Sequence, residues 1–178
     1  MTIRHLVDVH ILLIRDDRLL LSKRRSDDEF DGRWHLPAGK LEAGESATAA
    51  AAREANEETG VHIDPADLRH IHTAHVVGSG RDPRLGLFFE THHWTGTPTN
   101  REPDKSHELC WFPLDALPDN IIPYSASGIR AHFAGTTYSE RGWPAATLPD
   151  LLGLDEGADH IDLDLPRPGG HARGADLD

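Results

Sequence analysis

The stretch GKLEAGESATAAAAREANEETGV, residues 39–61, decides the fold of this chain. Its first part is a loop punctuated by two glycines, and its second part, from about Ser46, is rich in residues that favour an α-helix without tertiary help. Gly60 suits the left-handed position that ends a helix, and Val61 just beyond it can pack back onto the last turn. We therefore expect a loop that leads into a helix between Ser46 and Gly60.

Three glutamates near the end of this helix share one face. Glu54 lies three residues before Glu57 and four before Glu58, and residues at these spacings are neighbours on a helix. Two carboxylates about 6 Å apart repel each other by about 3 kcal/mol at an effective dielectric constant of about 20. A solvated acidic face is the ordinary explanation, but the preceding loop adds Glu45 at the helix N-terminus, where the dipole favours negative charge. Oxygen ligands crowded on a rigid helix suit Mg²⁺.

The stretch resembles the Nudix box, whose pattern is Gly-x5-Glu-x7-Arg-Glu-U-x-Glu-Glu-x-Gly-U, where U is apolar. Every specified position is matched, by Gly39, Glu45, Arg53, Glu54, Ala55, Glu57, Glu58, Gly60 and Val61. The box covers 23 of the 178 residues, and a looser similarity in the strand pattern extends to about Phe133. The chain is therefore identified as a member of the Nudix hydrolase family, of the MutT-like, nucleoside triphosphate pyrophosphohydrolase type.

The resemblance implies an α/β (α+β) fold, an α/β/α sandwich in which a mixed β-sheet lies between helices and the box forms a loop–helix–loop. The rest of the sequence agrees with a fold of this class. Short apolar or alternating runs predict strands over Val7–Ile14, Arg18–Ser22, Trp34–Gly39, His70–Val77, Leu85–Trp94 and Leu109–Phe112. The first two form a hairpin if Asp16-Asp17 makes the turn, and Tyr124–Phe133 is expected to be a second helix.

The resemblance also implies a metal site. Glu57 and Glu58 would bind Mg²⁺, or Mn²⁺ in its place, and Glu54 would bind metal or help to activate water. The backbone carbonyl of Gly39 often joins the metal ligands in this family. The chemistry needs such an ion, because a polyphosphate requires its charge neutralised and a water aimed in line at phosphorus.

Other box positions are expected to organise the site. Arg53 would orient a glutamate through a bidentate pair, while Glu45 and Gly60 would be structural positions of the box. Some relatives place the catalytic base in a later loop. In this chain Glu108 is the first candidate for that base and Glu102 the second, with Glu54 as the alternative within the box.

Three further residues are candidates for substrate binding. Arg24 lies in the basic group Lys23-Arg24-Arg25, which is either a solvated strand end or a contact for phosphates or the base. Trp34 belongs to the Trp-x-Leu-Pro-x-Gly lead-in to the box; it either packs in the core or stacks on the base. Lys105 lies in a Glu-Pro-Asp-Lys segment that resembles the corresponding loop of human relatives that hydrolyse nucleoside triphosphates.

Composition bounds the class of protein. A chain of 178 residues allows one substantial core. A net charge of −12 argues against a nucleic acid polymer as partner, and no apolar run reaches the roughly 20 residues of a membrane span. The start of the chain does not resemble a signal peptide. One cysteine, Cys110, excludes an intrachain disulfide, so that a cytoplasmic protein is expected. The family resemblance implies a small-molecule nucleotide as the substrate.

The sequence changes character from about Ser139. Residues 1–138 are expected to form the Nudix hydrolase domain, and 139–178 an acidic extension rich in proline and glycine. Nine acidic residues against three arginines favour a disordered or loosely packed extension. Its leucines and Ile161 leave open docking onto the domain or onto a partner subunit in a homodimer.

The leading functional hypothesis is hydrolysis of a nucleoside triphosphate to the monophosphate and pyrophosphate. The alternative is a pyrophosphatase acting on ADP-ribose or a nucleotide sugar. A Nudix domain without activity that senses a nucleotide is a third possibility, but such proteins usually lose box glutamates and this chain keeps all four. Relatives specific for oxidised guanine often carry a pair of carboxylates or an asparagine in the segment held here by residues 121–124. No pair of aspartates occurs there, which argues against this specificity.

Replacing Glu57 or Glu58 by Gln is expected to remove most of the turnover and to leave the fold intact. The reason is the shared helical face, whose mutual repulsion a bound cation relieves. Turnover at saturating Mg²⁺ measures the effect, and circular dichroism controls for folding. Near wild-type turnover in either variant would contradict the metal-binding role.

Overall fold

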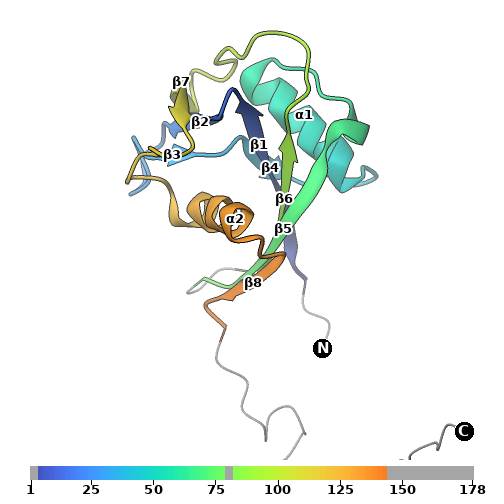
Figure 1. Cartoon of the computed structure of the whole chain (residues 1–178). Helices are drawn as coiled ribbons and strands as arrows, with labels where there is room; N and C mark the ends of the chain where they lie inside the picture. Colours follow the sequence, from blue (N-terminus) through green and yellow to red (C-terminus); the bar gives the residue numbers. More distant parts are fainter. Residues whose placement is uncertain (1–3, 79–81, 144–178) are drawn as a thin grey trace, which may run out of the picture. The chain divides into compact units, whose positions relative to one another are not determined.

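The predicted hairpin is present in the computed structural model, which describes residues 4–78 and 82–143 (Figure 1). Strand β1 (Leu6–Arg15) pairs antiparallel with β2 (Arg18–Arg24), and Arg15 lies opposite Arg18. Asp16 and Asp17 connect them with φ angles of 51° and 55°. Two successive left-handed residues match the right-handed twist of the flanking strands, so that a two-residue turn closes the hairpin.

The described residues form one mixed sheet of eight strands. The strands after the hairpin are β3 (Trp34–His35), β4 (Ala38–Lys40), β5 (Arg69–Val76), β6 (Arg84–Thr91), β7 (Ser106–Pro113) and β8 (Tyr138–Arg141). The order β3-β2-β1-β6-β5-β8 runs across the sheet, while β4 pairs with β1 and β7 with β2. Strand β1 thus pairs with three others, β2, β4 and β6. The β1–β6 and β5–β8 pairs are parallel and the others are antiparallel.

Helix α1 (Ala47–Thr59) is the predicted helix of the box, with the predicted ends. The Ser46 hydroxyl accepts a hydrogen bond from the backbone N–H of Ala49 at 3.2 Å, which caps the first turn. Gly60 ends the helix with φ at 72°, a conformation that favours glycine. A short 3₁₀ helix, η1 (Pro65–Asp67), follows before the chain enters β5.

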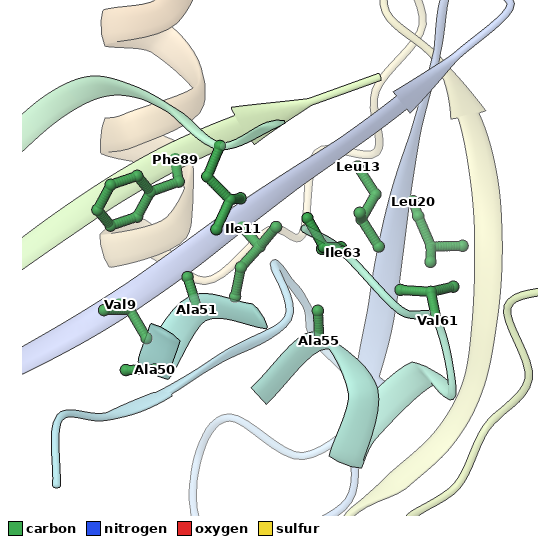
Figure 2. Close-up of a cluster of buried hydrophobic side chains, with 11 residues drawn as sticks. Val9, Ile11, Leu13, Leu20, Ala50, Ala51, Ala55, Val61, Ile63 and Phe89 are labelled. Carbon is green, nitrogen blue, oxygen red and sulfur yellow. The ribbon is translucent and has the colours of Figure 1, made fainter. Parts of the chain in front are cut away.

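The small side chains of α1 let it lie close to the sheet. Ala50, Ala51 and Ala55 are fully buried and pack with Val9 and Ile11 of β1 in one core cluster (Figure 2). Alanine adds little volume between the helix and the strands, so the helix backbone approaches β1 closely. This position of α1 is fixed by packing and sets where its opposite face presents the box glutamates.

Helix α2 (Pro123–Ala134) covers the other face of the sheet. Neighbouring residues of β6 point to opposite faces: Phe89 joins the core under α1, whereas Phe88 joins a second core that includes Ile129 of α2. A side chain at Gly128 would overlap the Phe88 ring, so that glycine lets α2 approach. The helices lie on opposite sides of the central strands (Figure 1), which confirms the α/β/α sandwich.

The sheet extends slightly beyond the predicted domain boundary. Residues 139–141 belong to β8, which pairs with β5. The chain divides into two units after Trp143, and the described residues belong to the first. Residues 144–178 of the predicted extension lie outside the described part of the chain. Neither of the described α-helices is long and apolar enough to cross a membrane.

Candidate active site

Arg53 ties the loop of the box to its helix. Its guanidinium donates to Glu45 at 2.8 Å, to Glu54 at 2.8 Å and to Glu57 at 3.3 Å, and it also donates to the carbonyl of Lys40 at 3.1 Å. These partners raise the pKa of Arg53, with the hydrogen bond to Glu45 as the largest favourable cause. The same bond holds the pKa of Glu45 below its usual range. One cation therefore organises three of the four box carboxylates.

Glu54 lies directly above the backbone of β4. A side chain at Gly39 would overlap the Glu54 carboxylate, which explains why this position is glycine. Gly39 is itself fixed by pairing with Val9 of β1. Burial raises the pKa of Glu54, Arg53 partly offsets the shift, and the charges of Glu57 and Glu102 add to it. Glu54 is thus a partly desolvated carboxylate that is held in place by one guanidinium.

Glu58 is the most strongly perturbed carboxyl group. Burial, followed by the nearby charge of Glu54, raises its pKa to about 8, and a hydrogen bond from the Ala38 backbone opposes the shift. Its Oε2 atom is buried and has no hydrogen-bond partner. A buried carboxylate oxygen without a partner is costly unless it is protonated or bound to a cation.

Glu57 differs from the other two glutamates of its face. Its side chain is 51% exposed and turns toward Arg53. It does not line the cavity that Glu54 and Glu58 line. No group of three or more histidine, cysteine or acidic side chains is close enough to hold a metal ion among residues 4–78 and 82–143. Of the three predicted metal ligands on α1, Glu54 and Glu58 therefore line the cavity and Glu57 does not, so that the role of Glu57 stays a prediction.

The loop before β7 docks onto the end of α1. The backbone N–H of Thr99 donates to the carbonyl of Thr59 at 2.8 Å, and that of Arg101 donates to the carbonyl of Glu58 at 3.0 Å. These bonds satisfy carbonyls that a helix end leaves without intrahelical partners. The next residue, Glu102, is thereby brought beside the box carboxylates.

Glu102 is held in a rigid turn. The Asn100 side chain accepts from the Glu102 backbone N–H at 3.1 Å and donates to the Ser106 carbonyl at 2.8 Å. Lys105 donates to the Glu102 carboxylate at 2.7 Å. Hydrogen bonding to Glu102 raises the pKa of Lys105, so that this cation stays charged at the cavity wall.

These residues line one cavity of about 680 Å³ that has two chemically different parts. The acidic part is defined by the box glutamates and the docked loop. Its members are Gly39, Lys40, Glu54, Glu58, Glu102 and Lys105. The neutral part contains aromatic rings and hydroxyl groups, and its members are His10, Ser22, His35, Ile122, Tyr124 and Ser125. Arg24 also lines the cavity.

Aromatic packing defines the neutral part. His10 is stacked on Phe88 with ring centroids 4.4 Å apart, and the edge of Tyr124 meets it at 4.7 Å. Burial, with smaller effects of His35 and Arg84, lowers the pKa of His10 to about 3, so this imidazole is neutral at physiological pH. Burial also lowers the pKa of His35. Both ring nitrogens of His10 and the Tyr124 hydroxyl are buried without partners.

The structure brings some of the predicted binding residues together and leaves others apart. Arg24 and Lys105 line the cavity, whereas Trp34 and Glu108 do not. Trp34 is 8% exposed and its ring meets the edge of Phe112 in the second core. Glu108 projects from β7 and forms an exposed ion pair with Lys23 at 3.0 Å. Glu102, the second candidate for the base, lies in the cavity instead.

The family resemblance pointed to the 121–124 segment, which includes Ile122 and Tyr124 of the neutral part, but nothing in the sequence assigned His10, Ser22, His35 or Ser125 to it. His10 interrupts an apolar strand, and this was its one local signal, because a buried position would otherwise be occupied by an apolar residue. Nothing local connects it with Tyr124, which comes more than a hundred residues later. Pairing of β1 with β4 and β6 and packing of α2 bring the two side chains together.

Comparison with known proteins identifies the family. The family model named NUDIX domain matches residues 4–131. This is well over half of the chain, so the chain belongs to the NUDIX family, as the box indicated. A crystal structure of the MutT NUDIX hydrolase from Burkholderia pseudomallei superposes with a TM-score of 0.66 and 27% sequence identity, over 72% of this chain and 98% of that one.

Curated relatives match parts of the chain. The "Putative 8-oxo-dGTP diphosphatase 2" of Mycobacterium tuberculosis is 45% identical over 114 residues, which are 60% of this chain and 72% of that protein. "Putative nudix hydrolase 1" of Caenorhabditis elegans is 29% identical over 143 residues, 79% of this chain. The chain spans 37% of the length of the C. elegans protein.

The stability of the metal-free protein is expected to fall as pH rises from about 4.5 to about 8. The folded state holds a proton on Glu58 up to a pKa of about 8, whereas the unfolded chain releases it near 4.5. The folded state therefore binds more protons in this window, and the Glu58 contribution to the free energy of unfolding decreases by up to about 1.4 kcal/mol per pH unit.

Urea unfolding in EDTA across this pH range measures the effect. Glu58→Gln should be increasingly more stable than the wild type as pH rises, while Glu57→Gln, which changes a half-exposed side chain of the same helix, serves as the matched control. A constant difference between wild type and Glu58→Gln across the window would show that Glu58 is not held in a desolvated site.

Proposed function

We propose that this protein is a Mg²⁺-dependent pyrophosphohydrolase that converts a nucleoside triphosphate, standard or modified, to the monophosphate and pyrophosphate. One observation carries the proposal: the partly buried carboxylates Glu54 and Glu58 share a single cavity with the cation Lys105 and with a neutral, aromatic part. A nucleotide has the matching division into a polyanion and an uncharged base. The cavity volume of about 680 Å³ lies within the range typical of small-molecule sites.

Relatives support the reaction class. The B. pseudomallei structure is titled a MutT NUDIX hydrolase, and the M. tuberculosis relative is named for the diphosphatase reaction on 8-oxo-dGTP, a modified nucleoside triphosphate. We propose that this chain, like that relative, cleaves a nucleoside triphosphate. We do not propose a specificity for an oxidised base, because the neutral part of the cavity contains no carboxylate.

The residues of the acidic part fit a divalent cation. Glu58 Oε2 is buried without a partner, and Glu54 is desolvated close to it. Mg²⁺ commonly takes one or two carboxylates and completes its shell with water and substrate phosphates, so Glu54 and Glu58 would hold it, with the Gly39 carbonyl nearby and Mn²⁺ as a substitute. The ion would neutralise phosphate charge and acidify a bound water.

The protein's own groups would orient the reactants. Arg53 holds Glu54 at a fixed position through a 2.8 Å bond, and an ordered carboxylate loses less entropy when the reaction begins. Lys105 and Arg24 supply positive charge at the cavity wall, although the protein as a whole is acidic. They would attract the phosphates, which the net charge of −12 repels at longer range.

We assign the role of general base to Glu102 in place of Glu108. Glu102 lines the cavity, is fixed by Asn100 and lies close enough to Glu54 and Glu58 to influence their pKa values. A base must reach the water whose proton it accepts. Glu108 forms its ion pair on the surface and does not line the cavity.

The substrate class is tested with nucleotides in ¹⁸O-labelled water. Incubation of the protein and Mg²⁺ with a panel of standard and oxidised nucleoside triphosphates should yield the monophosphate and pyrophosphate, with one ¹⁸O in one of these two products. Glu58→Gln, purified identically, controls for contaminating phosphatases. Inert triphosphates together with cleavage of ADP-ribose to AMP and ribose phosphate would overturn the proposal in favour of the alternative.

A pair of isosteric variants tests the base. Glu102→Gln should lower kcat by about 10² or more, the usual scale for positioned acid–base catalysis, with little change in Mg²⁺ affinity. Glu108→Gln, on the strand that follows, should leave kcat within about two-fold of the wild type because its surface ion pair is worth little. If neither variant lowers kcat, the role of base returns to Glu54; a loss confined to Glu108→Gln reverses the assignment.

A further inference from the structure

Two histidines meet at one end of the sheet, and neither lines the cavity. His5 immediately precedes β1, and His75 lies in β5. Their Nε2 atoms are 3.0 Å apart. Strand β6 lies between β1 and β5 in the sheet, so the two imidazoles bridge across an intervening strand. The contact is exposed to solvent.

Hydrogen bonding favours one tautomer of His75. The Tyr138 hydroxyl donates its one proton to the Glu140 carboxylate at 2.8 Å. Its oxygen is 3.4 Å from His75 Nδ1 and can then only accept, and this contact favours the tautomer that carries its proton on Nδ1. In that tautomer the Nε2 lone pair of His75 is directed at His5. A histidine that binds a metal usually donates its other ring N–H in this way.

Trp143 also contacts His75, through a hydrogen bond and through its ring. Its indole N–H donates to the His75 carbonyl at 3.2 Å. The indole ring lies 4.4 Å from the His75 ring and 6.4 Å from the His5 ring, measured between centroids. His75 is thus positioned by Tyr138, by Trp143 and by its own strand, which reduces the ordering that a ligand at its Nε2 atom would require.

We propose that His5 and His75 bind a first-row transition-metal ion such as Ni²⁺, Cu²⁺ or Zn²⁺ through their Nε2 atoms. Metal–imidazole bonds of about 2.0–2.1 Å put two nitrogens roughly 2.9 Å apart for ligands at right angles and roughly 3.4 Å apart for tetrahedral ligands. The observed separation of 3.0 Å falls between these values. His5 is exposed, and its neutral ring can move its proton to Nδ1 through solvent.

The site offers two protein ligands, and water would complete the shell. No third histidine, cysteine or acidic side chain joins such a group in the part of the chain that the structure describes. Imidazole ligands suit Ni²⁺, Cu²⁺ and Zn²⁺, whereas Mg²⁺ takes oxygen ligands. This site is therefore independent of the Mg²⁺ site that we propose in the cavity, and excess Mg²⁺ should not compete for it.

A bound ion would link the segment before β1 to β5 across β6. Because it would bind the folded state and not the unfolded chain, it would stabilise the fold by mass action. Metal binding should then raise the melting temperature as well as give a direct binding signal, and neither readout depends on hydrolysis. The acidic charge of Glu140, transmitted through Tyr138, would make the His75 nitrogen a better donor.

The experiment is a Ni²⁺ titration of the full chain in excess Mg²⁺, followed by calorimetry, by melting temperature and by tryptophan fluorescence. The wild type should bind one Ni²⁺ at this site, melt at higher temperature and lose fluorescence, because the ion lies beside Trp143. Trp143→Phe should still bind Ni²⁺ but lose most of the quenching. This variant separates binding at the histidine pair from binding elsewhere.

His5→Ala and His75→Ala should each raise the Kd for Ni²⁺ at least ten-fold and abolish the rise in melting temperature. Tyr138→Phe, which removes the hydroxyl beside His75, should weaken binding less than either histidine variant. His70→Ala, an exposed histidine of the same strand, is the matched control and should bind like the wild type. The proposal is overturned if the wild type does not bind Ni²⁺, or if His5→Ala and His75→Ala bind it as tightly as His70→Ala.

Discussion

The structure depends on holding two partly buried carboxylates, Glu54 and Glu58, on the side of α1 that faces the cavity. In a medium of low polarity such a pair is unfavourable unless each charge has a partner. Arg53 supplies that partner for Glu54 and reaches Glu45 in the loop at the same time. Glu58 has no such partner, and its unmatched oxygen remains beside the cavity. The unpartnered Glu58 carboxylate therefore lowers the stability of the metal-free fold, and a bound cation would restore it. Such local destabilisation is common at functional sites.

Packing of the neighbouring elements keeps the Glu54 and Glu58 side of α1 at the cavity. Buried alanines on the opposite face press α1 against β1, and the same strand pairs with β4, which carries Gly39 under the Glu54 carboxylate. The docked loop adds Glu102 by bonding to the last turn of the helix. Helix, strand and loop thus approach one another through backbone contacts that leave little freedom to any one carboxylate. Such restraint is what a preorganised site requires.

The sequence allowed prediction of local features and missed those that depend on long-range packing. The box helix, the hairpin with Asp16 and Asp17, and the alternation along β6 follow from short-range rules, and the structure agrees with each. Short-range rules could not show that Glu102 lines the cavity and that Glu108 does not. Both lie near β7, but one is carried by a loop that docks on α1 while the other pairs with Lys23 across the sheet.

Charge distribution explains how an acidic protein can receive an anionic ligand. The cavity joins carboxylates that favour a divalent cation to Lys105 and Arg24, which favour phosphate. A nucleotide that arrives with its metal carries much less negative charge than the free polyphosphate, so the overall charge of −12 opposes it less. The neutral imidazole of His10 adds no charge to the neutral part, where the proposed function would place the base. Selection by charge would thus act on the phosphates, and selection by shape and hydrogen bonding would act on the base.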